Sequence, residues 1–128
     1  MHCAESSPAA SKGVVLVADD DDAVRALIAR ILRGSGYTVL EACTSDEALA
    51  LGNDLKLLVA DLVMPSIGGV ELADAMRVRI PGLHVLFTSG YCRIGNSFGP
   101  DDPLLAKPFT AAELLLRVRQ LVGPTVIQ

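Results

Sequence analysis

Four consecutive carboxylates, Asp19 to Asp22, follow directly on the apolar run Val14–Ala18. A second apolar run, Leu57–Ala60, also ends in a carboxylate, Asp61. Clustered carboxylates repel one another and lose hydration where a strand buries them. A divalent cation with oxygen ligands would relieve that repulsion. If the two runs are neighbouring parallel strands, three acids meet at one edge of a sheet and can bind such a cation.

The elements that would position these acids alternate between continuous apolar runs and amphipathic stretches. Buried strands are predicted over residues 14–19, 37–40, 57–61, 83–89 and 104–106. Amphipathic helices are predicted over residues 24–33, 44–51, 70–80 and 110–122. Capping boxes open two of these helices, at Thr44–Glu47 and at Thr110–Glu113. The segment 92–103 is rich in Gly and Pro, so any helix there is short or absent.

Strands that alternate with helices predict an α/β fold with a parallel sheet covered by helices on both faces. Right-handed crossovers leave few topologies for such a sheet. Functional groups of these folds gather at the carboxyl ends of the strands, near the switch point of strand order. The residues at predicted strand ends are Asp19, Asp20, Asp61, Ser89 and Lys107. The sequence therefore predicts that these five residues share one edge of the sheet.

Length and charge narrow the class of protein. The 128 residues suit one domain, and 51% of them are hydrophobic, enough for a real core. The net charge is −4 and the 11 Lys and Arg residues are scattered, which argues against direct nucleic-acid binding. We expect a domain over residues 13–123, a flexible N-terminal tail over 1–12 and a C-terminal tail over 124–128.

Sequence features also predict the compartment. No apolar stretch reaches the roughly 18 residues that a membrane span requires, so no membrane insertion is expected. The start of the chain has neither the basic nor the apolar region of a signal peptide. An odd number of cysteines, Cys3, Cys43 and Cys92, with no C-x-x-C pair, suits reduced thiols. The expected location is the cytoplasm.

Four segments, in this order and at these spacings, resemble the receiver (CheY-like) domain of two-component response regulators. They read VLVADDDDAVR at 15–25, LVADLVMPSIGGVEL at 58–72, VLFTSGY at 85–91 and LLAKPFT at 104–110. The resemblance implies a doubly wound, five-stranded parallel sheet of order 2-1-3-4-5. It also implies that the chain is a phosphoacceptor that catalyses only its own phosphorylation and dephosphorylation, and is not otherwise an enzyme.

The resemblance implies a role for each residue at the site. Asp61 matches the phosphoacceptor, Ser89 the hydroxyl that closes on the phosphoryl group, and Lys107 the lysine that pairs with it. Thr88, one residue earlier than Ser89, competes for the hydroxyl role. The Lys107–Pro108 bond matches one that is usually cis in the family.

The implied cofactor is Mg²⁺. Asp20 and Asp61 match direct ligands, Asp19 matches an acid that acts mainly through a bound water, and Val63 supplies its backbone carbonyl. Leu104 departs from the family pattern, because an aromatic residue often stands there and changes rotamer with the hydroxyl.

The implied function is Mg²⁺-dependent transfer of a phosphoryl group to Asp61 from a phosphohistidine. The donor would be a histidine kinase or a histidine phosphotransfer protein. Phosphorylation would then switch a surface that binds an output partner. This surface would be formed by segment 92–103, the fifth strand and the last helix. Homodimerisation on phosphorylation is a further possibility. Two alternatives remain: a pseudo-receiver that only binds partners, and an Mg²⁺-dependent aspartyl phosphatase. Such phosphatases usually carry a second acid two residues after the nucleophile, and Val63 at that position argues against this alternative.

Overall fold

A computed structural model describes residues 13–51, 54–90 and 103–123 of the chain. The predicted tails and most of the predicted irregular segment 92–103 lie outside these residues. Five parallel strands form one sheet of order β2-β1-β3-β4-β5, as predicted. The strands are β1 Val14–Ala18, β2 Thr38–Ala42, β3 Leu57–Asp61, β4 His84–Ser89 and β5 Leu104–Ala106.

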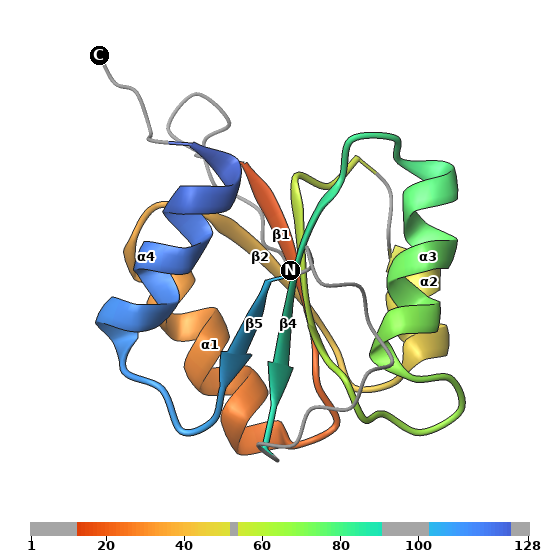
Figure 1. Ribbon diagram of the computed structural model, residues 1–128, viewed down its shortest axis with the longest axis horizontal. Helices are drawn as coiled ribbons and strands as arrows, with labels where there is room; N and C mark the ends of the chain where they lie inside the picture. Colours follow the sequence, from red (N-terminus) through yellow and green to blue (C-terminus); the bar gives the residue numbers. More distant parts are fainter. Residues whose placement is uncertain (1–12, 52–53, 91–102, 124–128) are drawn as a thin grey trace.

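Four helices of the described residues cover both faces of the sheet. They are α1 Asp22–Gly34, α2 Ser45–Leu51, α3 Gly69–Arg79 and α4 Ala111–Val122. Figure 1 shows α1 and α4 on one side of the sheet and α2 and α3 on the other. No helix in the described ranges is long and apolar enough to cross a membrane.

Alternation along each buried strand divides the core into two layers. Val15 and Val17 pack with residues of α1 and α4, whereas Leu16 and Ala18 pack with residues of α2 and α3. All five residues of β3 are buried, because this central strand has helices on both sides. The continuous apolar runs of the sequence therefore reflect strands that are buried on both faces.

Strand boundaries differ from the prediction by one or two residues. The backbone N–H of Tyr37 donates to the carbonyl of Leu32 in α1, so Tyr37 belongs to the turn and β2 begins at Thr38. Strand β1 ends at Ala18, although the N–H of Asp19 still donates to the carbonyl of Ala42 at 3.1 Å. Strand β4 begins at His84, one residue later than predicted.

One of the two predicted capping boxes forms. At the start of α4, Thr110 accepts from the Glu113 N–H and the Glu113 carboxylate accepts from the Thr110 N–H. At α2 the prediction was half wrong. Thr44 accepts from the Glu47 N–H, but the Glu47 carboxylate accepts from the N–H of Cys43, one residue earlier.

Candidate functional site

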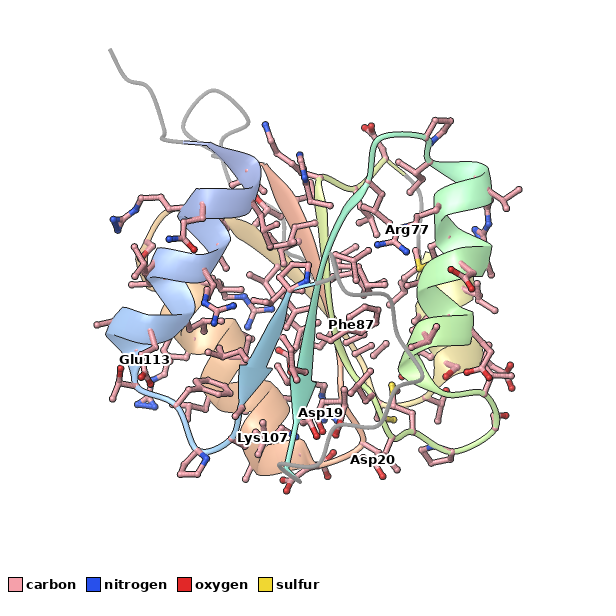
Figure 2. All side chains as sticks on the ribbon, viewed as in Figure 1. Asp19, Asp20, Arg77, Phe87, Lys107 and Glu113 are labelled. Carbon is pink, nitrogen blue, oxygen red and sulfur yellow. The ribbon has the colours of Figure 1, made fainter. Side chains whose placement is uncertain are left out.

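Three carboxylates converge at the carboxyl edge of the sheet, as the sequence predicted. Asp19 directly follows β1 and Asp61 ends β3, and these parallel strands pair with Ala18 beside Ala60. One carboxylate oxygen from each of Asp19, Asp20 and Asp61 lies within 4.8 Å of the other two. Asp19 is 1% exposed and Asp61 8% exposed, while Asp20 is exposed. Figure 2 shows Asp19 and Asp20 at this edge, close to Lys107.

Backbone amides fix two of these carboxylates. The N–H of Asp21 donates to Asp19 Oδ1 at 2.9 Å, and the N–H of Val63 donates to Asp61 Oδ1 at 3.2 Å. Both donors lie two residues after their acceptor, the Asx-turn pattern that aspartate favours. Each acid is therefore oriented by the loop that follows its own strand.

Close packing of helix α3 shapes the loop after Asp61. A Cβ atom at Gly69 would lie 2.3 Å from the backbone oxygen of Asp61, so only glycine fits without a shift. The Gly69 N–H donates to the carbonyl of Leu62, and the Leu62 N–H donates to the carbonyl of Thr88 at 2.9 Å. The second glycine of the loop thus allows α3 to begin directly beside the acceptor strand.

Lys107 supplies the positive charge of the site. Its Nζ lies 3.0 Å from Asp19 Oδ2 and 3.1 Å from Asp61 Oδ2. The Lys107 N–H donates to the carbonyl of Ser89 at 2.8 Å, which places the residue directly after β5 and beside β4. The Lys107–Pro108 bond is cis, as the sequence resemblance implied. One ammonium therefore faces two buried carboxylates, with a third close by.

Burial and charge act on both ion-pair partners. Burial raises the pKa of Asp61, and the hydrogen bond and charge of Lys107 offset this only in part. Burial lowers the pKa of Lys107, but its hydrogen bonds to Asp19 and Asp61 outweigh that effect and the pKa is raised overall. Lys107 is thus held charged, while burial makes the ionised form of Asp61 less favourable than it is for an exposed aspartate.

A cavity of about 570 Å³ opens above these groups. Its lining residues are Asp20, Asp21, Asp61, Val63, Gly90 and Lys107. Oxygen ligands suit a hard cation such as Mg²⁺, and the open cavity leaves room beside it for a small anionic group. The donor set therefore fits the cation that the sequence predicted.

The two candidate hydroxyls differ in placement. Thr88 pairs with Asp61 in register, is 1% exposed, and its Oγ1 has no hydrogen-bond partner among the described residues. Ser89 ends β4, is 5% exposed, and lies one position nearer the carboxyl edge. The structure places both next to the site, and neither lines the cavity.

Sequence reasoning missed Arg25 on α1. Its Nη1 donates to the backbone carbonyl of Asp19 at 3.0 Å. The signal in the sequence was weak, because Arg25 stands three residues after Asp22, which is only the spacing of an ordinary helical ion pair.

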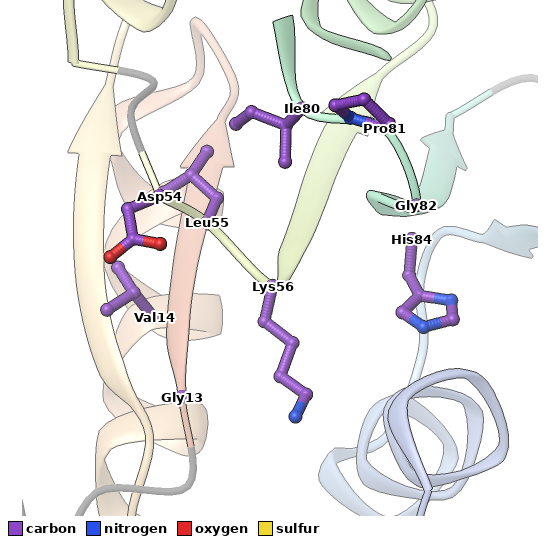
Figure 3. Close-up of a pocket in the computed structure, with 9 residues that line it drawn as sticks. All are labelled: Gly13, Val14, Asp54, Leu55, Lys56, Ile80, Pro81, Gly82 and His84. Atoms are coloured by element: carbon purple, nitrogen blue, oxygen red, sulfur yellow. The ribbon is translucent and has the colours of Figure 1, made fainter.

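A second cavity, of about 420 Å³, lies at the opposite edge of the sheet. Its lining includes Gly13 and Val14 at the start of β1, Lys56 just before β3, and His84 at the start of β4 (Figure 3). Lys56 and His84 are exposed. This amino edge brings together no group of three acid, His or Cys ligands among the described residues, in contrast to the carboxyl edge.

Comparison with known families and curated proteins gives one consistent result. Residues 15–119 match the model of the family described as response regulator receiver domain. The chain is 35% identical over 118 residues to the sensor kinase CckA of Brucella abortus, covering 84% of this chain and 12% of that protein. It is 36% identical to the response regulator MprA of Mycobacterium ulcerans, covering 89% of this chain and 52% of that protein. The chain thus spans about half, or much less, of these relatives.

Solved structures agree with this result. The receiver domain of the hybrid histidine kinase CckA has a TM-score of 0.74 and 37% identity, covering 84% of this chain and 97% of that one. A CheY-like response regulator receiver domain protein from Methanospirillum hungatei JF-1 has a TM-score of 0.75 and 30% identity, covering 84% and 90%. Both similarities span almost the whole of the solved chain.

Proposed function

Because the chain belongs to the response regulator receiver domain family of two-component systems, we propose that Asp61 is the residue that accepts its phosphoryl group. The observation that carries the proposal is the position of Lys107 Nζ, about equally far from Asp19 and Asp61 at the carboxyl edge of the sheet. A fixed ammonium beside a buried carboxylate can pair with the oxygens of an anionic group that approaches that carboxylate.

The acidic cluster is proposed as the Mg²⁺ site. Asp20 and Asp61 would bind the ion directly, together with the backbone carbonyl of Val63, and Asp19 would act through a water. Bound Mg²⁺ would neutralise charge on the transferring group and keep the attacking and leaving atoms in line. The convergence of three carboxylate oxygens, two of them from buried residues, supports this assignment.

In the proposed transfer, a carboxylate oxygen of Asp61 attacks the phosphorus of a phosphohistidine. A new O–P bond forms, the N–P bond of the donor breaks, and its electron pair stays on the imidazole nitrogen, which takes up a proton. Lys107 pairs with the phosphoryl oxygens throughout. Its two present partners hold the ammonium charged and in reach of that group.

After transfer, Asp61 would present about two negative charges and three strong acceptors. The Ser89 hydroxyl is proposed to donate to one of these oxygens, because Ser89 stands nearer the carboxyl edge than Thr88. Strand β5 and helix α4 are linked, since Arg117 Nη1 donates to the carbonyl of Leu104 at 3.1 Å. A displacement at the end of β4 would therefore reach β5 and α4, which are the described part of the proposed interaction surface.

Histidine kinases or histidine phosphotransfer proteins are the proposed donors, in the cytoplasm. The relatives named as a sensor kinase and as response regulators fit a kinase partner and an output partner. Homodimerisation on phosphorylation is a further part of the proposal. We expect no direct contact with nucleic acid by this domain, whose charge is −4 with scattered basic residues.

The first test is the intact mass after incubation with acetyl phosphate and Mg²⁺, with Asp61→Asn in parallel. We expect a gain of one phosphoryl group that requires Mg²⁺ and is lost in the variant. Asp74→Asn is a matched control, because Asp74 is an acid on α3 that is distant from the site in sequence and largely exposed. No gain, under conditions that label another receiver domain, would favour the pseudo-receiver. Sustained turnover of a phosphate ester would favour the phosphatase.

A further inference from the structure

Arg25 reaches from the first turn of α1 back to the acid-bearing segment. Its Nη1 donates to the Asp19 carbonyl at 3.0 Å, and its Nη2 lies 2.7 Å from Asp22 Oδ1. Its Nε donates to Glu41 Oε1 of β2 at 3.3 Å. The side chain is 16% exposed. One guanidinium thus joins the segment after β1 to the neighbouring strand.

These contacts complete a set of bonds around Asp19, and the bond from Arg25 is the one to the Asp19–Asp20 peptide. The N–H of Asp19 is bound by the Ala42 carbonyl, the Asp19 carboxylate by the Asp21 N–H, and the Asp19 carbonyl by Arg25. The peptide plane between Asp19 and Asp20 sets the direction in which the Asp20 side chain leaves the backbone. The Asp20 side chain is itself exposed, so the Arg25 bond to the Asp19 carbonyl is a contact through which its orientation can be fixed.

We propose that Arg25 is a positioning residue for the cation site: it holds the Asp19–Asp20 peptide so that both carboxylates point at the same ion. This inference rests on the proposed Mg²⁺ site and adds a residue to it. The guanidinium suits the task because its rigid fork presents several donors at once, here to a carbonyl and two carboxylates. A lysine has a single ammonium on a flexible stem and cannot reproduce that fork.

A positioning role and a purely electrostatic role of Arg25 predict opposite changes in the Mg²⁺ Kd when the side chain is removed. Arg25 carries a positive charge near a cation site, so removal of the charge alone should strengthen Mg²⁺ binding. Loss of a positioning bond should weaken it, and partners that orient metal ligands commonly change metal affinity about 10–100-fold. The direction of the change in Kd separates the two roles.

Arg33 offers a matched control on the same helix. Like Arg25, it contacts Glu41, with Nη1 3.1 Å from Oε2, and it donates to one backbone carbonyl, that of Val39. Within the described ranges, no hydrogen bond or ion pair joins Arg33 to Asp19–Asp22, and its side chain is 51% exposed. Arg33→Ala therefore removes the same charge and a similar pair of contacts, but leaves the Asp19–Asp20 peptide bound.

The experiment measures the Mg²⁺ Kd by calorimetric titration of the wild-type protein, Arg25→Ala, Arg25→Lys and Arg33→Ala, all well below their unfolding temperatures. We expect Arg25→Ala to weaken binding about tenfold, Arg25→Lys to weaken it about threefold, and Arg33→Ala to change it less than twofold. Amide NMR spectra without Mg²⁺ should show shifts centred on residues 19–22 for Arg25→Ala only.

Each outcome decides the inference. An unchanged or lower Kd in Arg25→Ala, with the wild-type protein binding normally, would overturn the positioning role and leave the proposed function intact. If Arg25→Ala does not fold, Arg25→Lys decides in its place, and wild-type affinity in that variant would overturn the role. Equal weakening by Arg33→Ala would also overturn it. Failure of the wild-type protein to bind Mg²⁺ would overturn both the role and the proposed cation site.

Discussion

Replacement of Asp61 by Asn should stabilise the Mg²⁺-free protein at neutral pH, although it removes the proposed phosphoacceptor. Asn has nearly the same shape as Asp, and its Oδ1 can still accept the Val63 N–H. The variant therefore keeps the volume of the side chain but loses its charge and the acceptor for Lys107, which keeps its bond to Asp19. We therefore expect that the carboxylate of Asp61 lowers the stability of the Mg²⁺-free fold, although the proposed function requires it.

The magnitude follows from the charges around Asp61. Oxygens of Asp19 and Asp61 lie within 4.8 Å of each other, a repulsion of roughly 3.5 kcal/mol at an effective dielectric constant of about 20. The attraction of Lys107 Nζ at 3.1 Å is about 5 kcal/mol on the same scale. Asp20 is exposed and adds a weaker repulsion. These charge effects nearly cancel, so the desolvation of the buried Asp61 carboxylate determines the net effect. Asp61→Asn should therefore raise the free energy of unfolding by about 1 kcal/mol.

The assay is urea unfolding followed by circular dichroism at pH 7, in the presence of a chelator. A gain of this size would move the midpoint by about 0.5 M urea, or the melting temperature by about 3–5 °C. Asp74→Asn is again the control. Asp74 Oδ1 is 3.7 Å from Arg77 Nη1 on an exposed helix surface, and its loss should change stability by less than about 0.5 kcal/mol.

The raised pKa of Asp61 also predicts how the stability difference between the two proteins changes with pH. Because the pKa of Asp61 is raised above its usual 3.8, the folded protein binds this proton more tightly than the unfolded chain. Stability is therefore lost as the pH rises from that value through the raised folded pKa. Asn does not titrate, so its advantage should be full at pH 7 and should shrink as the pH falls toward 4.

In the presence of Mg²⁺, the wild-type protein should be more stable than Asp61→Asn. A ligand that binds only the folded state adds about 2.7 kcal/mol at a concentration one hundred times its Kd. The wild-type protein should gain this stabilisation, and Asp61→Asn, which lacks one of the three carboxylates, should gain much less. The reasoning would be refuted if Asp61→Asn were less stable than wild type by about 1 kcal/mol or more in chelator at pH 7, because the Lys107 attraction would then dominate.

Three further predictions concern the surroundings of the site. Gly69→Ala should destabilise the fold by about 2–4 kcal/mol in urea unfolding, because its Cβ would lie 2.3 Å from the Asp61 backbone oxygen. Gly34→Ala, where nothing lies within 4 Å of the new Cβ, should instead gain about 0.5 kcal/mol. Thr110→Ala should cost about 1 kcal/mol in the same assay through loss of the α4 cap, and equal stability would contradict the role of the capping box. Ser89→Ala should slow labelling by acetyl phosphate about tenfold and Thr88→Val should not, as one hydrogen bond to a charged group would predict; the opposite order would transfer the hydroxyl role to Thr88.

The part of the structure that the sequence predicted is the part set by short-range patterns. Continuous apolar runs such as Val14–Ala18 mark strands that are buried on both faces, and a parallel sheet then brings every strand end to one edge. That single step was enough to place Asp19, Asp61 and Lys107 together. The α/β class and the meeting of these strand-end residues were therefore predictable from local pattern, whereas the strand order 2-1-3-4-5 came from the family resemblance.

The partners of individual side chains were not predictable in the same way. The capping box at Thr44 was half wrong because the Glu47 carboxylate has two backbone N–H groups within reach and binds that of Cys43. Arg25 was missed because its partners Asp19 and Glu41 are 6 and 16 residues away, and one of the acceptors is a backbone carbonyl. A carbonyl has no sequence signature, so only the folded geometry reveals the contact.

The departure at Leu104 shows how the structure changes an expectation taken from a family pattern. The sequence lacks the aromatic residue often found there, which removes the rotamer change as a signal. In the structure Leu104 is half-buried against the α2–α3 side of the core, and its carbonyl accepts from Arg117 of α4. Movement of β5 would therefore be transmitted through the backbone to α4, and the side chain at position 104 need not change its rotamer. Strand β5 and α4 are linked by this hydrogen bond and by the core cluster that Leu105 shares with Leu114 and Val118, so the linkage does not require an aromatic residue at 104.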